Sequence, residues 1–165
     1  MKLIVGLGNP GKIYQNTRHN LGANVILNLT KNLQLKPKFQ AGIKKCPGRI
    51  YAASTTYMNE SGLSVQKLVN FYKINLSDLY VVHDDLDLEV GEWKLQFDRG
   101  HAGHHGIESI IQHLGSQQFW RLRIGIGHPP VNIPVDDYVL KPFLSEEKEK
   151  ISAVIDKIVR EIPNL

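Results

Sequence analysis

The sequence predicts an α/β layered fold in which helices flank a mixed, mostly parallel central sheet. Short apolar runs alternate along the chain with segments whose apolar residues recur at helical spacing. The run from Leu79 to Val82 has no polar interruption, as expected of a strand buried on both faces. A chain of 165 residues, 42% of them hydrophobic, is long enough to bury one core, so we expect a single domain spanning residues 1–165.

The predicted elements follow one another in a regular order. Strand patterns cover residues 2–6, 39–46, 49–54, 79–82, 93–97 and 119–126. Helical periodicity covers residues 20–33, 63–72, 107–114 and 145–162. Gly115 is expected to close the third helix. Ser145 is expected to be the N-cap of the last helix, with Glu146 and Glu147 in the first turn.

Composition excludes several classes of protein. No apolar run approaches the ~20 residues that a membrane span requires. The chain enters its first strand at once, without the apolar segment and cleavage site of a signal peptide. The single cysteine, Cys46, has no partner for an internal disulfide. These features predict a cytoplasmic protein with no membrane partner.

Charge is distributed unevenly along the chain. Residues 1–59 hold nine Lys or Arg and no acid, whereas the remainder holds 11 Lys or Arg and 16 Asp or Glu. This asymmetry favours a polyanionic partner for the N-terminal part, and RNA, DNA or a phosphorylated small molecule would each satisfy it. The alternative is that the two halves interleave in the fold and give a surface of mixed charge.

The segment from Gly6 to Asn20, GLGNPGKIYQNTRHN, follows the first predicted strand. Its glycines fit the G-x-G-x-x-G spacing of a dinucleotide-binding turn. That turn also needs a helix at the third glycine and an acidic residue about 20 residues later, but Pro10 lies inside the turn and no acid precedes Glu60. The segment is instead rich in hydrogen-bonding side chains, which indicates a site for polar chemistry.

Four polar loops follow predicted strands. They cover residues 9–19, 55–59, 83–87 and 101–105. In α/β folds, functional sites gather where the strands end. We therefore expect these loops to converge at one edge of the sheet.

His19 and Asp84 are the pair in these loops best suited to acid–base chemistry. A neutral imidazole can take a proton from water near neutral pH, and a carboxylate on its other nitrogen fixes the tautomer and stabilises the imidazolium. The alternative is a structural loop histidine. Asn9 and Asn59 offer uncharged amides that can orient a peptide-like substrate or stabilise an oxyanion, although both residues are also common in turns.

No nucleophilic side chain suits covalent catalysis. Cys46 precedes a Pro-Gly turn away from the histidine loops, and no serine lies in a G-x-S-x-G elbow. Attack by an activated water is therefore the simpler mechanism. The histidines and acids of residues 83–87 and 101–105 match neither a zinc nor a calcium motif, so we expect no metal and no other cofactor.

Six motifs in order resemble the bacterial-type peptidyl-tRNA hydrolases. They are G-L-G-N-P-G, Y-x-N-T-R-H-N, Y-M-N-x-S-G, H-D-D-L-D, G-H-x-G-H-x-G and R-L-R-I-G-I-G-H-P, and the match continues to Phe143. The resemblance implies a monomeric three-layer α/β sandwich. It also implies hydrolysis of the ester between a peptide and the 3′ ribose of tRNA, with the 3′ end and acceptor stem as the bound parts and no role for DNA.

The resemblance also implies roles for individual residues. His19 looks like the general base, Asp84 its orienting partner, and Asn9 the residue that recognises the peptide. Residues that match positions lining the peptide and 3′-end site are Tyr14, Tyr57 and Asn59. Lys94 and Arg123 are the candidates for phosphate contact.

Three departures from the family pattern bear on these roles. His105 replaces the usual Asn of G-H-N-G, where it keeps a hydrogen-bonding group and adds a titratable one. Gln96 stands where a second basic residue often follows Lys94, and the chain ends at Leu165, sooner than many members do.

The alternative function is an RNA-binding relative that has lost catalysis. His105 alone favours it, and the retention of His19, Asp84, Asn9 and Asn59 argues against it. A nucleotide-binding enzyme is disfavoured because the ribose-binding acid is missing.

Overall fold

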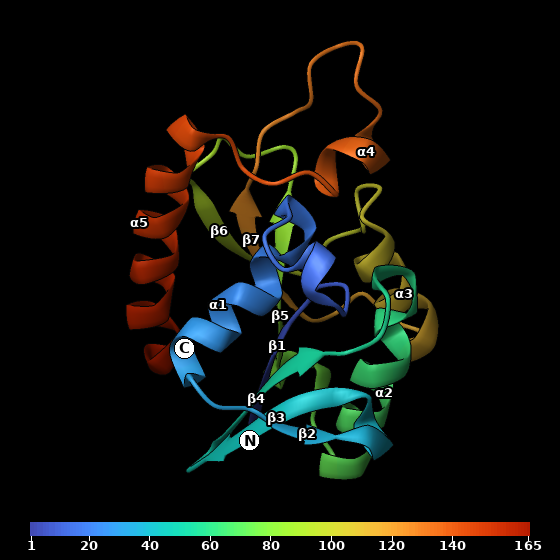
Figure 1. Ribbon diagram of the computed structural model, residues 1–165. Coiled ribbons are helices and arrows are strands. Elements are labelled where there is room, and N and C mark those ends of the chain that lie inside the picture. Colours follow the sequence, from blue (N-terminus) through green and yellow to red (C-terminus); the bar gives the residue numbers. More distant parts are fainter.

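The computed structural model describes residues 1–165 and is built on one seven-stranded sheet with helices on both faces (Figure 1). The sheet has the strand order β2-β3-β4-β1-β5-β7-β6. Pairings β1–β4, β1–β5 and β5–β7 are parallel, and β2–β3, β3–β4 and β6–β7 are antiparallel. The predicted mixed sheet is therefore confirmed. The strands are β1 (Lys2–Gly6), β2 (Gln34–Lys36), β3 (Ala41–Cys46), β4 (Arg49–Ser54), β5 (Leu79–Asp85), β6 (Trp93–Phe97) and β7 (Trp120–Gly125).

Two hydrophobic clusters, one on each face of the sheet, attach the helices. One cluster joins the sheet to α2 and α3, and the other joins it to α1 and α5. Central strand β1 contributes to both, because Leu3 and Val5 belong to the first cluster and Ile4 to the second. The helices are α1 (Leu21–Thr30), α2 (Ser61–Tyr72), α3 (His105–Leu114), α4 (Val135–Val139) and α5 (Ser145–Glu161), and none is long and apolar enough to cross a membrane.

Four details differ from the sequence-based predictions. Helix α1 ends at Thr30 and not at residue 33, because Lys31 takes a left-handed conformation with φ of 56° and the chain turns into the unpredicted strand β2. Ser145 is the first residue of α5 and not its N-cap. The N-cap is Leu144, whose backbone N–H donates to the Glu147 carboxylate at 2.7 Å. The short helix α4 was also not predicted.

A close approach between α1 and the sheet positions the segment that carries His19. Gly22 lies against β5 so tightly that a Cβ atom there would be 2.1 Å from the carbonyl oxygen of Val82. The backbone N–H of Leu7 donates to the same oxygen, and the N–H of Ala23 donates to the carbonyl of Leu7. The single-turn helix Arg18–Asn20, which precedes α1, is thereby held beside the carboxyl end of β5.

Candidate active site

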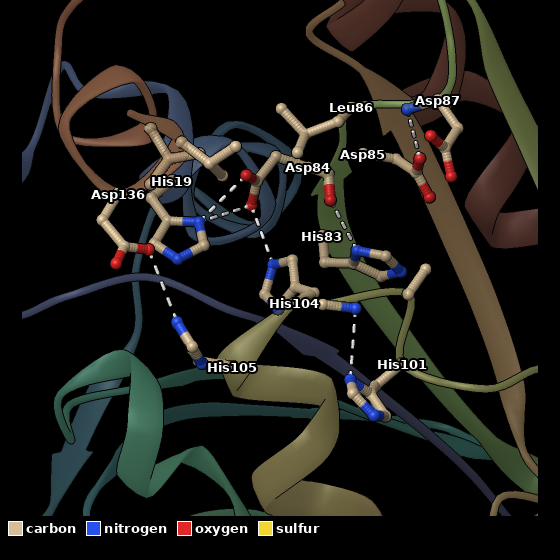
Figure 2. Close-up of a pocket in the computed structure, with 14 residues that line it drawn as sticks. His19, His83, Asp84, Asp85, Leu86, Asp87, His101, His104, His105 and Asp136 are labelled. Atoms are coloured by element: carbon tan, nitrogen blue, oxygen red, sulfur yellow. Dashed lines mark hydrogen bonds and ion pairs between the residues drawn. The ribbon is translucent and has the colours of Figure 1, made fainter. Parts of the chain in front are cut away.

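His19 and Asp84 form a buried hydrogen-bonded pair. His19 lies on the single-turn helix before α1, and Asp84 lies near the end of β5, where burial on both sides fixes the strand. Nδ1 of His19 is 3.0 and 2.9 Å from the two carboxylate oxygens of Asp84. Figure 2 shows the other ring nitrogen turned away from Asp84. The pair predicted from the sequence is therefore in contact, with Nε2 of His19 left for a further partner.

The electrostatics of this pair favour a basic imidazole. Burial lowers the pKa of His19, but the charge and hydrogen bond of Asp84 outweigh burial and hold this pKa above its ordinary value of 6.5. Burial likewise raises the pKa of Asp84, yet the imidazoles of His19 and His104 hold it far below its usual range. Asp84 is thus a permanent carboxylate at neutral pH, able to stabilise an imidazolium next to it.

A second imidazole, that of His104, completes the hydrogen bonding of Asp84. Its Nε2 lies 3.0 Å from Oδ1 of Asp84, while its Nδ1 accepts the backbone N–H groups of Gly106 and Ile107 at 3.1 and 3.3 Å. Because Nδ1 is an acceptor, the proton sits on Nε2, and His104 is a neutral donor to the carboxylate. His104 is also the N-cap of α3. We did not predict this role, because the helical pattern was expected to begin only at Ile107 and α3 begins at His105.

The amide of Asn9 has a defined orientation. Its Oδ1 accepts the backbone N–H of Met58 at 2.8 Å. Its backbone is fixed in turn by Asn20, whose side chain bonds both the N–H and the carbonyl of Asn9. Since Oδ1 is occupied, the Nδ2 donor remains for the cleft that Asn9 lines.

Most of the predicted site residues share one cleft, with a volume of about 430 Å³. The ring of Tyr14 meets that of Tyr57 edge to face, with centroids 6.5 Å apart. Tyr57 is exposed, so its ring remains available to a ligand. The predicted residues that line the cleft are Asn9, Tyr14, His19, Tyr57, Asn59 and His105.

His105 and Asp136 face each other across this cleft. Nε2 of His105 is 3.4 Å from the Asp136 carboxylate (Figure 2). Nδ1 of His105 is 3.7 Å from the Glu108 carboxylate. His105 and Asp136 also line a second, smaller cavity of about 40 Å³, which His19, His83, Asp84 and His104 bound from the other side. That volume has room for about three waters. The pair therefore stands at the boundary between the open cleft and the buried histidines.

Arg18 anchors the His19 segment to the C-terminal part of the chain. Its guanidinium donates to the carbonyl of Pro142 at 2.8 Å and to the Glu147 carboxylate at 2.7 Å. It also stacks over the ring of Tyr138 at 4.1 Å. The single turn that carries His19 is thus held from both sides, by the sheet and by the segment linking α4 to α5.

The two predicted phosphate-contacting residues differ in exposure. Lys94 on β6 is exposed, and it pairs in register with Arg123 on β7. Arg123 is buried, with its Nε 2.7 Å from the Asp85 carboxylate and its Nη1 3.0 Å from Gln96. In this arrangement Lys94 alone presents its charge to solvent, whereas Arg123 holds Asp85 beside the active-site strand.

One group of side chains has the composition of a metal site. His19, Asp84 and His104 offer ligand atoms within 4.8 Å of one another. These atoms already bond each other, so an ion would have to replace both histidine–carboxylate hydrogen bonds. The expected absence of a metal stays a prediction.

Comparison with known proteins assigns the chain to a family. A family model described as peptidyl-tRNA hydrolase matches residues 3–165. Peptidyl-tRNA hydrolase of Coxiella burnetii is 45% identical over 100% of this chain and 90% of its own, and that of Aquifex aeolicus is 47% identical over 97% and 87%. A crystal structure of the Acinetobacter baumannii enzyme superimposes with a TM-score of 0.92 at 37% identity, covering 99% of this chain and 87% of that one. This chain therefore belongs to the peptidyl-tRNA hydrolase family.

Proposed function

We propose that this protein hydrolyses the ester that joins a peptide, or an N-blocked amino acid, to the 3′ ribose of tRNA, and so returns free tRNA to translation. The observation that carries the proposal is the His19–Asp84 hydrogen bond beside a cleft lined by neutral amides and tyrosines. Family membership supports the same substrate. The proposed location is the cytoplasm, where peptidyl-tRNA is produced.

The imidazole of His19 is the proposed general base. A water at its free Nε2 gives up a proton to the ring as the water oxygen attacks the ester carbon, and Asp84 stabilises the imidazolium that forms. The tetrahedral intermediate then releases the 3′ oxygen of the ribose, which takes the proton back from His19. An alkoxide leaves more readily than an amine, so the mechanism needs no separate strong acid.

Asn9 is proposed to select the acyl group. With Oδ1 bonded to the Met58 N–H, its Nδ2 presents a donor to the cleft. A donor pairs with the carbonyl oxygen of a peptide or blocked amino group, but it repels the ammonium of an ordinary aminoacyl-tRNA. This geometry would spare aminoacyl-tRNA, which translation needs intact.

Recognition of the tRNA is proposed to rest on backbone and shape, since the substrate is any tRNA. The predicted phosphate contact of Lys94 fits its exposure, and Arg123 would act through Asp85 or after rearrangement of their ion pair. All proposed catalytic groups come from one chain, so a monomer would suffice.

The test is the release of peptide from an N-blocked aminoacyl-tRNA by the wild type and by His19→Ala, with unblocked aminoacyl-tRNA as the second substrate. We expect the wild type to cleave only the blocked ester and His19→Ala to be about 10²–10⁴-fold slower, the usual contribution of general base catalysis. Binding of tRNA without cleavage by the wild type would favour the alternative, an RNA-binding relative impaired by His105.

A further inference from the structure

A lysine-rich surface lies at the opposite end of the molecule from the cleft. It is formed by the carboxyl end of α2, the edge strand β2 and its neighbour β3, whereas the cleft lies near α4 and the amino end of α3 (Figure 1). We call it the lysine surface and define it by Lys36, Lys38, Lys45, Lys67, Lys73 and Phe71, all of which are exposed.

The sheet register places the strand lysines on the same face as α2. Lys36 pairs with Ala41, and Lys45 follows Ala41 at an even spacing on β3, so both side chains leave the sheet on the side covered by α2. Nζ of Lys45 lies 4.6 Å from the ring centroid of Tyr72 on α2, which agrees with this placement. The lysines of β2, β3 and α2 therefore share one surface.

Aromatic rings form the floor of this surface. Phe71 packs 5.0 Å from both Phe39 and Tyr72, which hold its ring in place, yet the residue is 57% exposed. Nζ of Lys38 lies 4.1 Å from the centroid of Phe71. A large aromatic ring thus remains more than half open to solvent among cationic side chains.

Few acidic residues neighbour the lysines in the sequence. The only acids among residues 1–78 are Glu60, which precedes the amino end of α2, and Asp78, which follows α2 and lies 3.6 Å from the N-terminal ammonium. None of the five lysines forms an ion pair; Lys67 donates instead to the neutral amide of Gln40 at 2.7 Å. The surface therefore presents uncompensated positive charge to a ligand.

We propose that the lysine surface binds a single-stranded segment of RNA, with lysines on the phosphates and a base stacked on Phe71. Unpaired cations around an open aromatic ring are the features that bind single strands without sequence preference. A folded acidic protein could pair with the lysines, but it would not account for the exposed ring of Phe71. This contact goes beyond the proposed hydrolysis, because it engages RNA at a place distant from the ester.

The test measures binding of a labelled oligoadenylate of about eight nucleotides, a length within the usual site size for such surfaces. The oligonucleotide has no aminoacyl ester, so its binding is independent of whether the proposed hydrolysis occurs. Lys38→Gln/Lys45→Gln/Lys73→Gln is expected to lower the slope of log K against log salt by about 2, since each single-strand phosphate contact contributes about 0.7. Phe71→Leu is expected to weaken binding at least about fivefold while leaving that slope unchanged.

The control Lys148→Gln/Lys150→Gln/Lys157→Gln removes the same charge from α5 and is expected to bind the oligonucleotide as the wild type does. Amide chemical shifts that change on binding are expected at the carboxyl end of α2 and on β2 and β3. Equal loss of binding in the two triple variants, or shifts confined to the cleft, would overturn the proposal. The proposal would also be overturned if inorganic polyphosphate bound as tightly as the oligonucleotide and Phe71→Leu had no effect on binding.

Discussion

Asp84 sits between two imidazoles, and its charge sets how basic His19 is. In Asp84→Asn the carboxylate no longer offsets burial, so the pKa of His19 should fall. We expect the acid limb of the kcat/KM profile to move to lower pH. We also expect the rate on the plateau to drop about 10²–10⁴-fold, because the imidazolium formed during the reaction loses its partner.

The measurement is the pH dependence of blocked aminoacyl-tRNA cleavage. Asp87→Asn is the matched control, since Asp87 lines the same small cavity but is half exposed and pairs with His128 and Arg99. An acid limb that stays in place in Asp84→Asn would show that Asp84 does not control His19.

His105 adds a second titratable ring to the cleft. Protonated His105 would hold Asp136 across the cleft mouth and add positive charge near His19. We expect His105→Asn to retain activity. We also expect the acid limb of its kcat/KM profile to change and to fit the titration of a single group. The check is the pH profile of His105→Asn beside that of Asp136→Asn. The second variant keeps the rings of His19 and His105 but removes the carboxylate that faces His105. An unaltered profile in His105→Asn would contradict the role given to this ring.

Residue chemistry singled out His19 and Asp84 as a pair, with a structural loop histidine as the alternative, and the family resemblance pointed to the same pair. It did not predict the second bond from His104. That bond depends on the tautomer imposed by the backbone N–H groups of α3, which only the placement of the helix reveals. It also did not predict the burial of Arg123, since the alternation of a strand does not say which of its polar residues meets a partner such as Asp85.

At the scale of elements, the packing of α1 on the sheet leaves no room for a single added methyl group. In Gly22→Ala the new Cβ would meet backbone atoms of Val82 and Leu7, which cannot turn aside as a side chain can. We expect a loss of about 1–3 kcal/mol in the free energy of unfolding. We also expect lower activity, because α1 carries the turn that holds His19.

Urea denaturation and the cleavage rate of the same preparation check this expectation. Gly100→Ala serves as control, because a Cβ there meets nothing within 4 Å. Equal stability of Gly22→Ala and wild type would mean that α1 can move away from the sheet without cost.

Apolar periodicity predicted the longer strands and helices well and the shortest ones poorly. Strands β1, β4 and β6 and helix α2 lie close to where the patterns placed them. Strand β2 has three exposed residues and helix α4 only five, so neither has enough apolar repeats to be distinguished from a loop. The end of α1 was misplaced because Lys31, a non-glycine residue, takes the left-handed conformation that ends the helix.

At the scale of the whole molecule, sheet topology explains why loops distant in sequence form one site. Strands β1, β4 and β5 are parallel neighbours, so the segments after them emerge at the same edge. That rule predicted the convergence of Asn9, Asn59 and Asp84. It did not predict that Asp136 from α4 would close the cleft, because a contact between a loop helix and the site depends on three-dimensional packing that no local pattern encodes.

The buried histidines also make the stability of the whole fold depend on pH. Burial lowers the pKa of His83 to about 3 from its ordinary 6.5. Between these values the unfolded chain binds a proton that the folded protein does not, so this residue makes stability fall as pH falls through that window. His19 acts in the opposite sense, because its raised pKa adds stability below 6.5 that is lost as pH rises through the folded value.

We therefore expect His83→Asn to reduce the loss of stability between pH 6.5 and 4.5, since its amide keeps a donor for the Asp84 carbonyl but cannot be protonated. A single such group changes the free energy of unfolding by at most about 1.4 kcal/mol per pH unit, which urea denaturation can resolve. His128→Asn, which removes an imidazole from an exposed position, is the control for the loss of a histidine as such. If wild type and His83→Asn lose stability in parallel on acidification, another group must take up the proton, and His83 would be charged in the folded protein despite its burial.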